Sequence, residues 1–207
     1  MSVEVLQELV RAPSPVFRCF GAGCEWHRRF YARLRHSLRP PAPADDIAWA
    51  QERLTGAASD LLEFCRQHDG FVLYRDSLSD TAGIEMLPIR RWPEATTEMR
   101  TWLEMLCDGD DPDRLGTGVA FATAPRSANY FVTPVEGPAT GRVFYAQHDD
   151  WYEAPFARDF QAFLNRIARD PVTLVRDLGS FARYSDGLSA TQWIPEAYYP
   201  DSDLIDD

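Results

Sequence analysis

Several features that would assign this sequence to a common class are missing from it. None of its apolar runs approaches the ~20 residues that a membrane-spanning helix needs. Among the four cysteines there is no C-x2-C pair, and only Cys19 and Cys24 lie close together. Because structural zinc sites use paired cysteines or histidines at short spacing, we expect reduced thiols rather than a metal centre. The first residues also lack the basic start of a signal peptide, so we expect a soluble cytoplasmic protein.

Motifs of the common enzyme classes are absent as well. The sequence contains no G-x-S-x-G nucleophile elbow. Two G-x-G pairs lack the third glycine of a dinucleotide-binding loop, because Trp26 and Phe121 stand in its place. An EF-hand loop beginning at Asp108 would need glycine and glutamate where this chain has Asp113 and Val119. We therefore expect no catalytic residue, no metal and no cofactor.

The charge of the chain is unevenly distributed. Its 207 residues include 32 acidic and 21 basic ones, for a net charge of −11, and every basic residue is an arginine. Residues 1–40 hold seven arginines and three acids, so the rest of the chain carries −15. A body this acidic repels nucleic acid and attracts basic partners, so we expect no direct nucleic-acid binding. The apolar content of 45% is typical of a globular chain, whose length suits one domain with extensions.

Residues 1–40 look separable from the rest of the chain. Apolar residues at helical spacing predict a short helix over 3–10, and apolar residues every fourth position from Trp26 to Leu38 predict a second helix over 24–38. A basic amphipathic helix is typical of membrane or nucleic-acid adaptors, but we favour one that packs on the neighbouring acidic body. The proline-rich stretch over 39–43 predicts a linker. We therefore divide the chain into an N-terminal extension (1–40), a domain (41–178) and a C-terminal extension (179–207).

The middle of the chain alternates helical and strand patterns. Helices are predicted from 44 and from 59, with Asp45, Asp46 and Ser59 at the places where N-caps are expected. Apolar runs over 71–74 and 84–87 have the length of strands, and proline at position 93 predicts the start of a longer helix.

The last third begins with a predicted β region. Runs rich in Val, Phe and Tyr over 118–123, 130–133 and 142–146 are joined by short turns, which predicts an antiparallel meander. An amphipathic helix comes next, over 156–167. The aromatic, turn-rich stretch over 182–195 predicts a strand or arm packed on the domain.

The histidines are the residues most easily mistaken for catalytic or metal-binding groups. His148, Asp149 and Asp150 can in principle hold a metal or relay a proton, but a polar turn is favoured because partners at ligand spacing are missing. We interpret His68 as a core histidine on an apolar helix stripe. His36 is expected at the surface of the arginine-rich helix.

Two blocks share their order and spacing with a known family. The first contains AQERL at 50–54, SDLLE at 59–63, Phe64, His68-Asp69-Gly70 and Gly83–Pro88; the second contains Gly137-Pro138, Gly141–Tyr145, His148–Asp150, Phe156-Ala157, Phe160, Phe163-Leu164 and Asp170-Pro171. Together they resemble the SUKH superfamily, named partly for fungal Smi/Knr-type cell-wall regulators, over residues 43–175. One departure is Asp69-Gly70 where the family usually has Asn-Gly, and both pairs suit that turn.

The resemblance implies an α+β fold with a single, mainly antiparallel twisted sheet flanked by helices. Bacterial members of the family look like immunity proteins of polymorphic toxin systems, which neutralise a cognate toxin, often a nuclease, by direct binding. Fungal members are regulatory interaction modules. We therefore expect a non-catalytic immunity protein for a basic nuclease toxin, with a regulatory scaffold that has no toxin partner as the alternative. The toxin's identity and the oligomeric state stay open.

Acidic loops are the expected partner-binding surface. Carboxylates speed the encounter with a cationic partner, and aromatic residues supply the anchor that gives affinity. The candidate residues are Asp76 and Asp80 in one loop, Asp108, Asp110, Asp111 and Asp113 in a second, and Asp149, Asp150, Trp151, Tyr152 and Glu153 in a third.

Overall fold

The computed structural model describes most of the chain. The described residues are 2–13, 16–21, 29–54, 58–78, 82–106, 115–125, 127–147 and 154–169, together with 171, 174, 178, 184 and 193–195. The strands are β1 (Val16–Gly21), β2 (Arg29–Leu38), β3 (Phe71–Asp76), β4 (Ile84–Met86), β5 (Val119–Ala124), β6 (Asn129–Thr133), β7 (Phe144–Ala146) and β8 (Trp193–Pro195). The helices are α1 (Ser2–Arg11), α2 (Ala44–Arg53), α3 (Ser59–Gln67), α4 (Trp92–Leu106) and α5 (Phe160–Arg169), with 3-10 turns η2 (Ile89–Arg91) and η3 (Leu115–Thr117).

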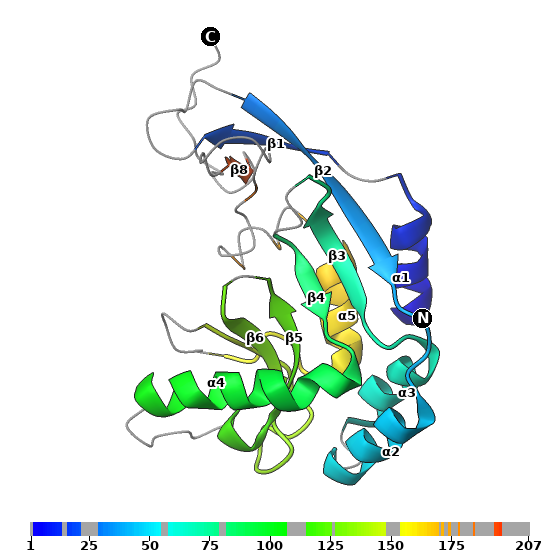
Figure 1. Cartoon of the computed structure of the whole chain (residues 1–207), viewed down its shortest axis with the longest axis vertical. Coiled ribbons are helices and arrows are strands. Elements are labelled where there is room, and N and C mark those ends of the chain that lie inside the picture. Colours follow the sequence, from blue (N-terminus) through cyan, green and yellow to red (C-terminus); the bar gives the residue numbers. More distant parts are fainter. Residues whose placement is uncertain are drawn as a thin grey trace.

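The strands form one curled antiparallel sheet of eight strands (Figure 1). Its order is β7-β6-β5-β4-β3-β2-β1-β8, so seven strands are neighbours in chain order and the last one joins beside the first. Cys19 in β1 is the register partner of Pro195 in β8. The predicted α+β class and the meander over β5–β7 are confirmed. Of the strand or arm predicted over 182–195, the structure describes Tyr184 and β8, which pairs with β1 of the N-terminal segment.

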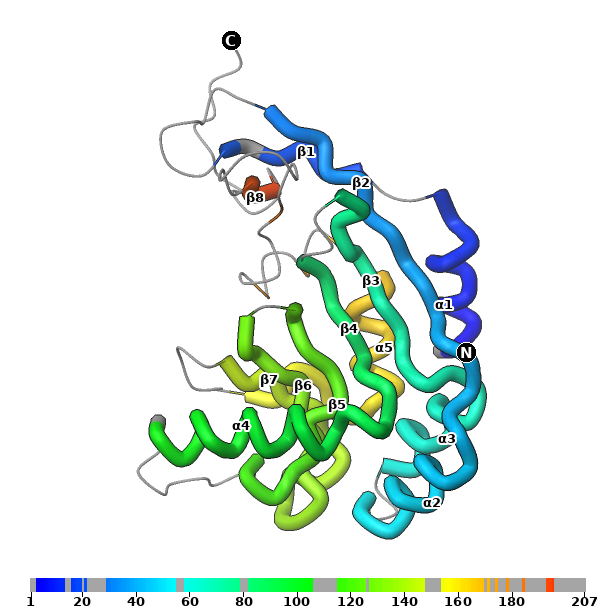
Figure 2. The backbone as a smooth tube through the Cα atoms, viewed as in Figure 1, coloured from blue at the N-terminus to red at the C-terminus, as the bar shows by residue number. Residues whose placement is uncertain are grey.

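Helices cover both faces of the sheet, but unequally. On one face, Phe64 of α3 packs against Phe71, and Phe160 of α5 packs against Phe121. On the other face, α4 lies across β5 and β6, where Thr96 accepts a hydrogen bond from the backbone N–H of Ala120. Figure 2 shows α5 behind the strands and α4 in front of them. The strands β5 and β6 are therefore covered on both sides.

The predicted helix over 24–38 is wrong wherever the structure describes it. Residues 29–38 form β2, which pairs with β1 on one side and with β3 on the other. Residues 24–28 lie outside the described part of the chain. The N-terminal segment thus contributes strands to the same sheet as the rest, rather than a basic helix, while the short helix expected over 3–10 is confirmed as α1.

The expected helix caps also differ from those observed. The N-cap of α2 is Pro43 and that of α3 is Ala58, and neither makes a side-chain capping bond. Asp45 and Asp46 lie inside the first turn of α2, where a carboxylate still interacts favourably with the helix dipole. Ser59 is the first residue within α3 rather than its cap. None of the helices among the described residues combines the length and the apolar character needed to cross a bilayer.

Candidate functional site

The strands β1 and β2 expose one row of side chains each, and the two rows share a face. Along β2 the odd-numbered residues are exposed, whereas Ala32 and Leu34 between them are buried. Residues directly opposite in an antiparallel pair point to the same side, and Arg18 of β1 is the register partner of Tyr31. We call this surface the arginine face: Arg18, Arg29, Tyr31, Arg33 and Arg35.

The arginine face is supported from beneath by buried aromatic packing. On the opposite side of the same strands, Phe30 contacts the ring of Trp193 with 5.3 Å between centroids, and Phe17 meets Tyr184 at 6.3 Å. Cys19 is fully buried there, and burial raises the pKa of its thiol to about 12, so the thiol stays neutral. The aromatic contacts on this inner side therefore hold β1 and β2 in place.

An ion triad continues the arginine face toward the middle of the sheet. Arg35 is the register partner of Arg75, and one strand further on the Glu85 carboxylate lies between two guanidinium groups. Its Oε2 accepts a hydrogen bond from Arg75 at 2.7 Å and its Oε1 accepts one from Arg39 at 2.6 Å. The side chain of Arg75 is only 9% exposed, and that of Glu85 is 21% exposed. The triad is therefore partly desolvated, which strengthens the attraction between its members.

His36 lies on the buried side of β2, not at the surface as the sequence predicted. Its Nδ1 accepts a hydrogen bond from the backbone N–H of Tyr74 at 3.1 Å, and burial lowers its pKa to about 4. Tyr74 has a positive φ of 56°, at a point where the β2–β3 register shifts. The Tyr74 hydroxyl donates to the carbonyl of Ile167 at 2.8 Å. A neutral imidazole therefore supports an irregular backbone that ties the sheet to α5.

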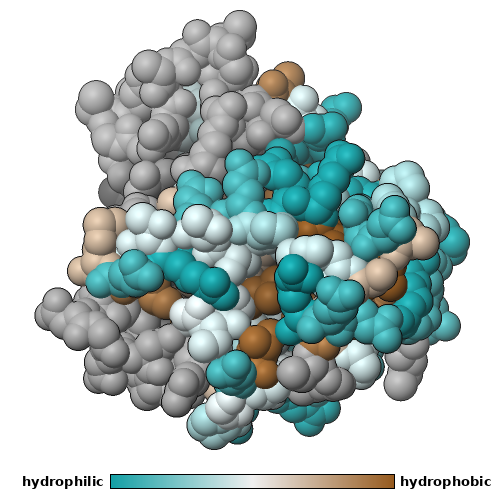
Figure 3. Space-filling view, turned by 60° about the horizontal axis from the view of Figure 1, so that its bottom comes forward, coloured by the Kyte–Doolittle hydropathy of each residue, from teal (hydrophilic) through white to brown (hydrophobic). Residues whose placement is uncertain are grey.

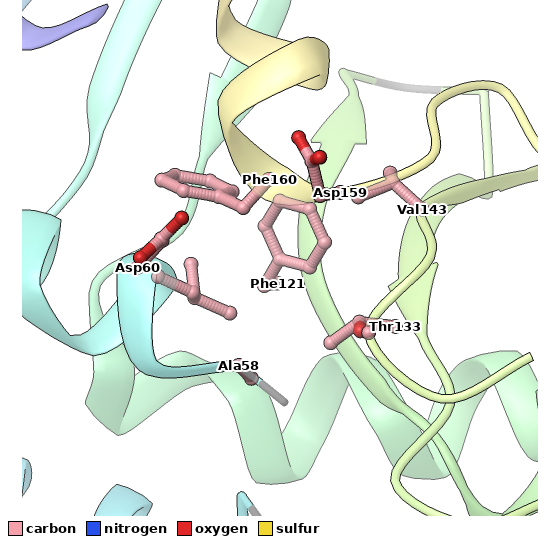
Figure 4. Close-up of a pocket in the computed structure, with 9 residues that line it drawn as sticks. Ala58, Asp60, Phe121, Thr133, Val143, Asp159 and Phe160 are labelled. Atoms are coloured by element: carbon pink, nitrogen blue, oxygen red, sulfur yellow. The ribbon is translucent and has the colours of Figure 1, made fainter. Parts of the chain in front are cut away.

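A shallow pocket lies where the first turns of α3 and α5 approach β5 and β6. Its empty volume is about 290 Å³, which includes open solvent, and Phe121 and Phe160 are among the residues that line it (Figure 4). Its two carboxylates stand apart, with the ring of Phe160 between them in this view. Asp159 accepts a hydrogen bond from the N–H of Ala162, so it caps α5, while Asp60 lies in the first turn of α3. The arrangement suits helix capping better than paired acid–base chemistry.

Other groups that often carry chemistry have structural partners. The Asp69 carboxylate accepts a hydrogen bond from the N–H of Ile89, and burial raises its pKa. His68 lies within 3.1 Å of the carbonyl of Arg39, consistent with its interpretation as a packed histidine. Burial raises the pKa of the Cys65 thiol. Among the described residues no group of three or more His, Cys, Asp or Glu is placed to hold a metal ion.

Most of the predicted partner-binding residues lie outside the described part of the chain. These are Asp80, Asp108, Asp110, Asp111, Asp113, Asp149, Asp150, Trp151, Tyr152 and Glu153, and the neighbouring His148 as well. The exception is Asp76, and here the expectation of an exposed loop residue is wrong. Asp76 ends β3 and is fully buried, and its Oδ1 accepts a hydrogen bond from the N–H of Leu78.

The residues of the arginine face were not among the predicted site residues. Their signal is present in the sequence, because Arg29, Tyr31, Arg33 and Arg35 alternate with less polar residues at a period of two. On the face seen in Figure 3 the described side chains are mainly hydrophilic, with separate hydrophobic spots. The arginine face is thus the most coherent candidate site among the described residues.

In comparisons with known proteins, the sequence matches no family model and no curated protein. The resemblance to the SUKH superfamily therefore rests on the two sequence blocks alone.

Proposed function

We propose that this chain is a non-catalytic protein-binding domain of the SUKH type that acts as an immunity protein. It would neutralise a cognate toxin, a basic nuclease, by binding it directly. The observation that carries the proposal is the charge of −15 on residues 41–207, which suits a basic partner. The arginine face has the opposite charge, so its exposed Arg and Tyr side chains support a protein-binding role in general and not contact with a basic toxin.

The structural roles of the histidine and aspartate side chains support a binding function over a catalytic one. His36, His68 and Asp159 each take part in a hydrogen bond that stabilises the fold. A general base or nucleophile needs instead to face substrate at an accessible position.

The toxin partner is supported by charge. With −15 on residues 41–207, long-range attraction would speed the encounter with a cationic nuclease and disfavour anionic competitors. The candidate acidic loops of the sequence belong to this part of the chain.

Co-expression tests the proposal. The chain is produced in bacteria together with the toxin domain encoded beside its own gene, and surviving colonies and co-purification are measured. We expect survival to rise by orders of magnitude and the two proteins to purify as a complex whose association slows at high salt. Absence of both protection and complex would reject the immunity role and leave the regulatory scaffold as the better interpretation.

A further inference from the structure

The arginine face is an unusual feature on a chain with a net charge of −11. Four of its five residues are arginines, and all five are exposed. Tyr31 is 61% exposed, and Val16, the register partner of Arg33, is 52% exposed. Two large apolar groups thus lie among four cations on one face of two paired strands. This combination is characteristic of a protein-binding surface, since a surface whose charges only contact water would not require exposed apolar groups.

The spacing of the arginine face is that of a β-sheet. Alternate residues of one strand are about 6.6 Å apart, and neighbouring strands are about 4.8 Å apart. Arg29, Arg33 and Arg35 therefore form a row along β2, with Arg18 beside it on β1. In an extended segment that lies along this row, every second side chain faces the row at the same spacing. Acidic residues at alternate positions of such a segment would meet successive guanidinium groups.

The neighbouring ion triad shows how arginines on this sheet recognise an anion. Arg39 and Arg75 donate to the two oxygens of the Glu85 carboxylate at 2.6 and 2.7 Å. Hydrogen bonds between guanidinium and carboxylate are charge-assisted and about twice as strong as neutral ones. A carboxylate from another molecule can be bound by guanidinium groups in the same way.

We propose that the arginine face docks an extended acidic segment of a partner protein, with Tyr31 and Val16 receiving an apolar side chain of that segment. An acidic peptide is favoured over nucleic acid because a long polyanion would run on over a body that carries −15. A short segment experiences mainly the local field, since charges beyond about 8 Å are screened at physiological salt. This surface is distinct from the acidic loops proposed to attract the toxin, so it is a second interaction site of the protein.

The test is direct binding to defined probes. Fluorescence anisotropy is measured for a labelled peptide of about 12 residues, roughly 40 Å when extended, with alternating Glu and a central Leu. A matched peptide has Gln in place of Glu, and a single-stranded oligonucleotide carries the same net charge. The full chain is compared with the double variant R18E/R33E, with Y31A, and with R142E as a control for a charge reversal elsewhere, since Arg142 is exposed in the turn before β7.

We expect the Glu peptide to bind, the Gln peptide to bind much more weakly, and R18E/R33E to lose about tenfold or more in affinity. Y31A should lose affinity with little change in salt dependence, and R142E should behave as the wild type. Because the substituted side chains are exposed, thermal melts should show all variants folded.

Three outcomes of the peptide-binding experiment would overturn the proposal. They are equal binding of the Glu and Gln peptides, tighter binding of the oligonucleotide than of the Glu peptide, and an R142E effect as large as that of R18E/R33E. A dimer that R18E/R33E dissociates would make a second copy the occupant and would also reject it. None of these outcomes depends on toxin protection, so failure of the immunity role is distinguishable from failure here.

Discussion

The strands β5 and β6 use their side chains differently from the strands β1 and β2. In β6 every residue is buried, and in β5 all but one are, because α4 covers one side and α5 the other. In β2 buried and exposed residues alternate along the strand. Where both faces are covered, side chains are committed to packing. Where only one is covered, the opposite row can evolve toward contacts with other molecules, and that is where the arginines lie.

The largest expected effect comes from the doubly covered region. Phe163 is fully buried and its ring contacts Phe121, Phe131 and Phe160. Phe163→Ala should lower the free energy of unfolding by about 3–5 kcal/mol, because it removes apolar contacts and leaves a cavity. Urea denaturation measures this loss. A loss of less than ~1 kcal/mol would mean that the side chains around β5 and β6 are packed no more tightly than those around β1 and β2.

A pH titration tests the buried side of β2. The pKa of His36 is about 4 in the folded chain and about 6.5 when unfolded, so below pH 6.5 the unfolded chain binds a proton that the folded chain does not. The free energy of unfolding should therefore fall by up to about 3 kcal/mol between pH 6.5 and 4, and should not depend on this group above pH 7.

His36→Asn is the matched variant, because the amide oxygen can still accept the hydrogen bond from Tyr74. Its stability should fall less steeply over the same interval. The raised pKa of Asp69 acts in the opposite direction but is common to both proteins, so the difference isolates His36. Parallel profiles for the two proteins would contradict the assignment.

Glu85→Gln tests how much the ion triad, at the boundary between the two regions, contributes to stability. It removes the negative charge between Arg39 and Arg75, and the second of these is nearly buried. We expect a loss of about 1–2 kcal/mol, less than for a fully buried pair because Arg39 is partly solvated. Glu63→Gln is the control: Glu63 pairs with Arg66 at 3.0 Å on the exposed side of α3, and its loss should cost about 0–0.5 kcal/mol.

The smallest effect is expected on the arginine face itself. Arg33→Ala should change the free energy of unfolding by no more than about 0.5 kcal/mol, because the side chain is exposed and the strand is held from the other side. A loss comparable to that of Phe163→Ala, measured in the same urea titration, would make the face a structural element and would erase the contrast between the two regions.

The sequence predicts α3 and β3 well. Leu61, Phe64 and Cys65 recur at helical spacing and are buried in α3, and the run from Phe71 has strand length and forms β3. These elements have a strong local pattern. The region shaped by distant partners is predicted poorly: spacing of four, as in Phe30, Leu34 and Leu38, fits both a helix and one side of a strand. The burial of Ala32 and the exposure of the arginines between these positions fit a strand and not a helix. The strand in turn depends on pairing with β1 and β3.

The candidate site was harder to predict than the fold. Asp76 is acidic and precedes a turn-rich stretch, so it resembles a loop residue, but β3 extends far enough to bury it. His36 is polar beside five arginines, so it resembles a surface residue, but the strand places it on the inner side. In both cases the side on which a residue points is set by strand register, which a single sequence does not fix.

The pairing of β8 with β1 has a consequence for the order of events during synthesis. Trp193, which covers Phe30, is translated after every other described strand, so the ribosome must add most of the chain before β1 gains its second neighbour. At cellular rates of about 5–20 residues per second, the apolar side of the hairpin waits roughly ten seconds or longer. The arginine face on the other side of β1 and β2 is therefore, among the described parts of the sheet, the last to acquire its final support.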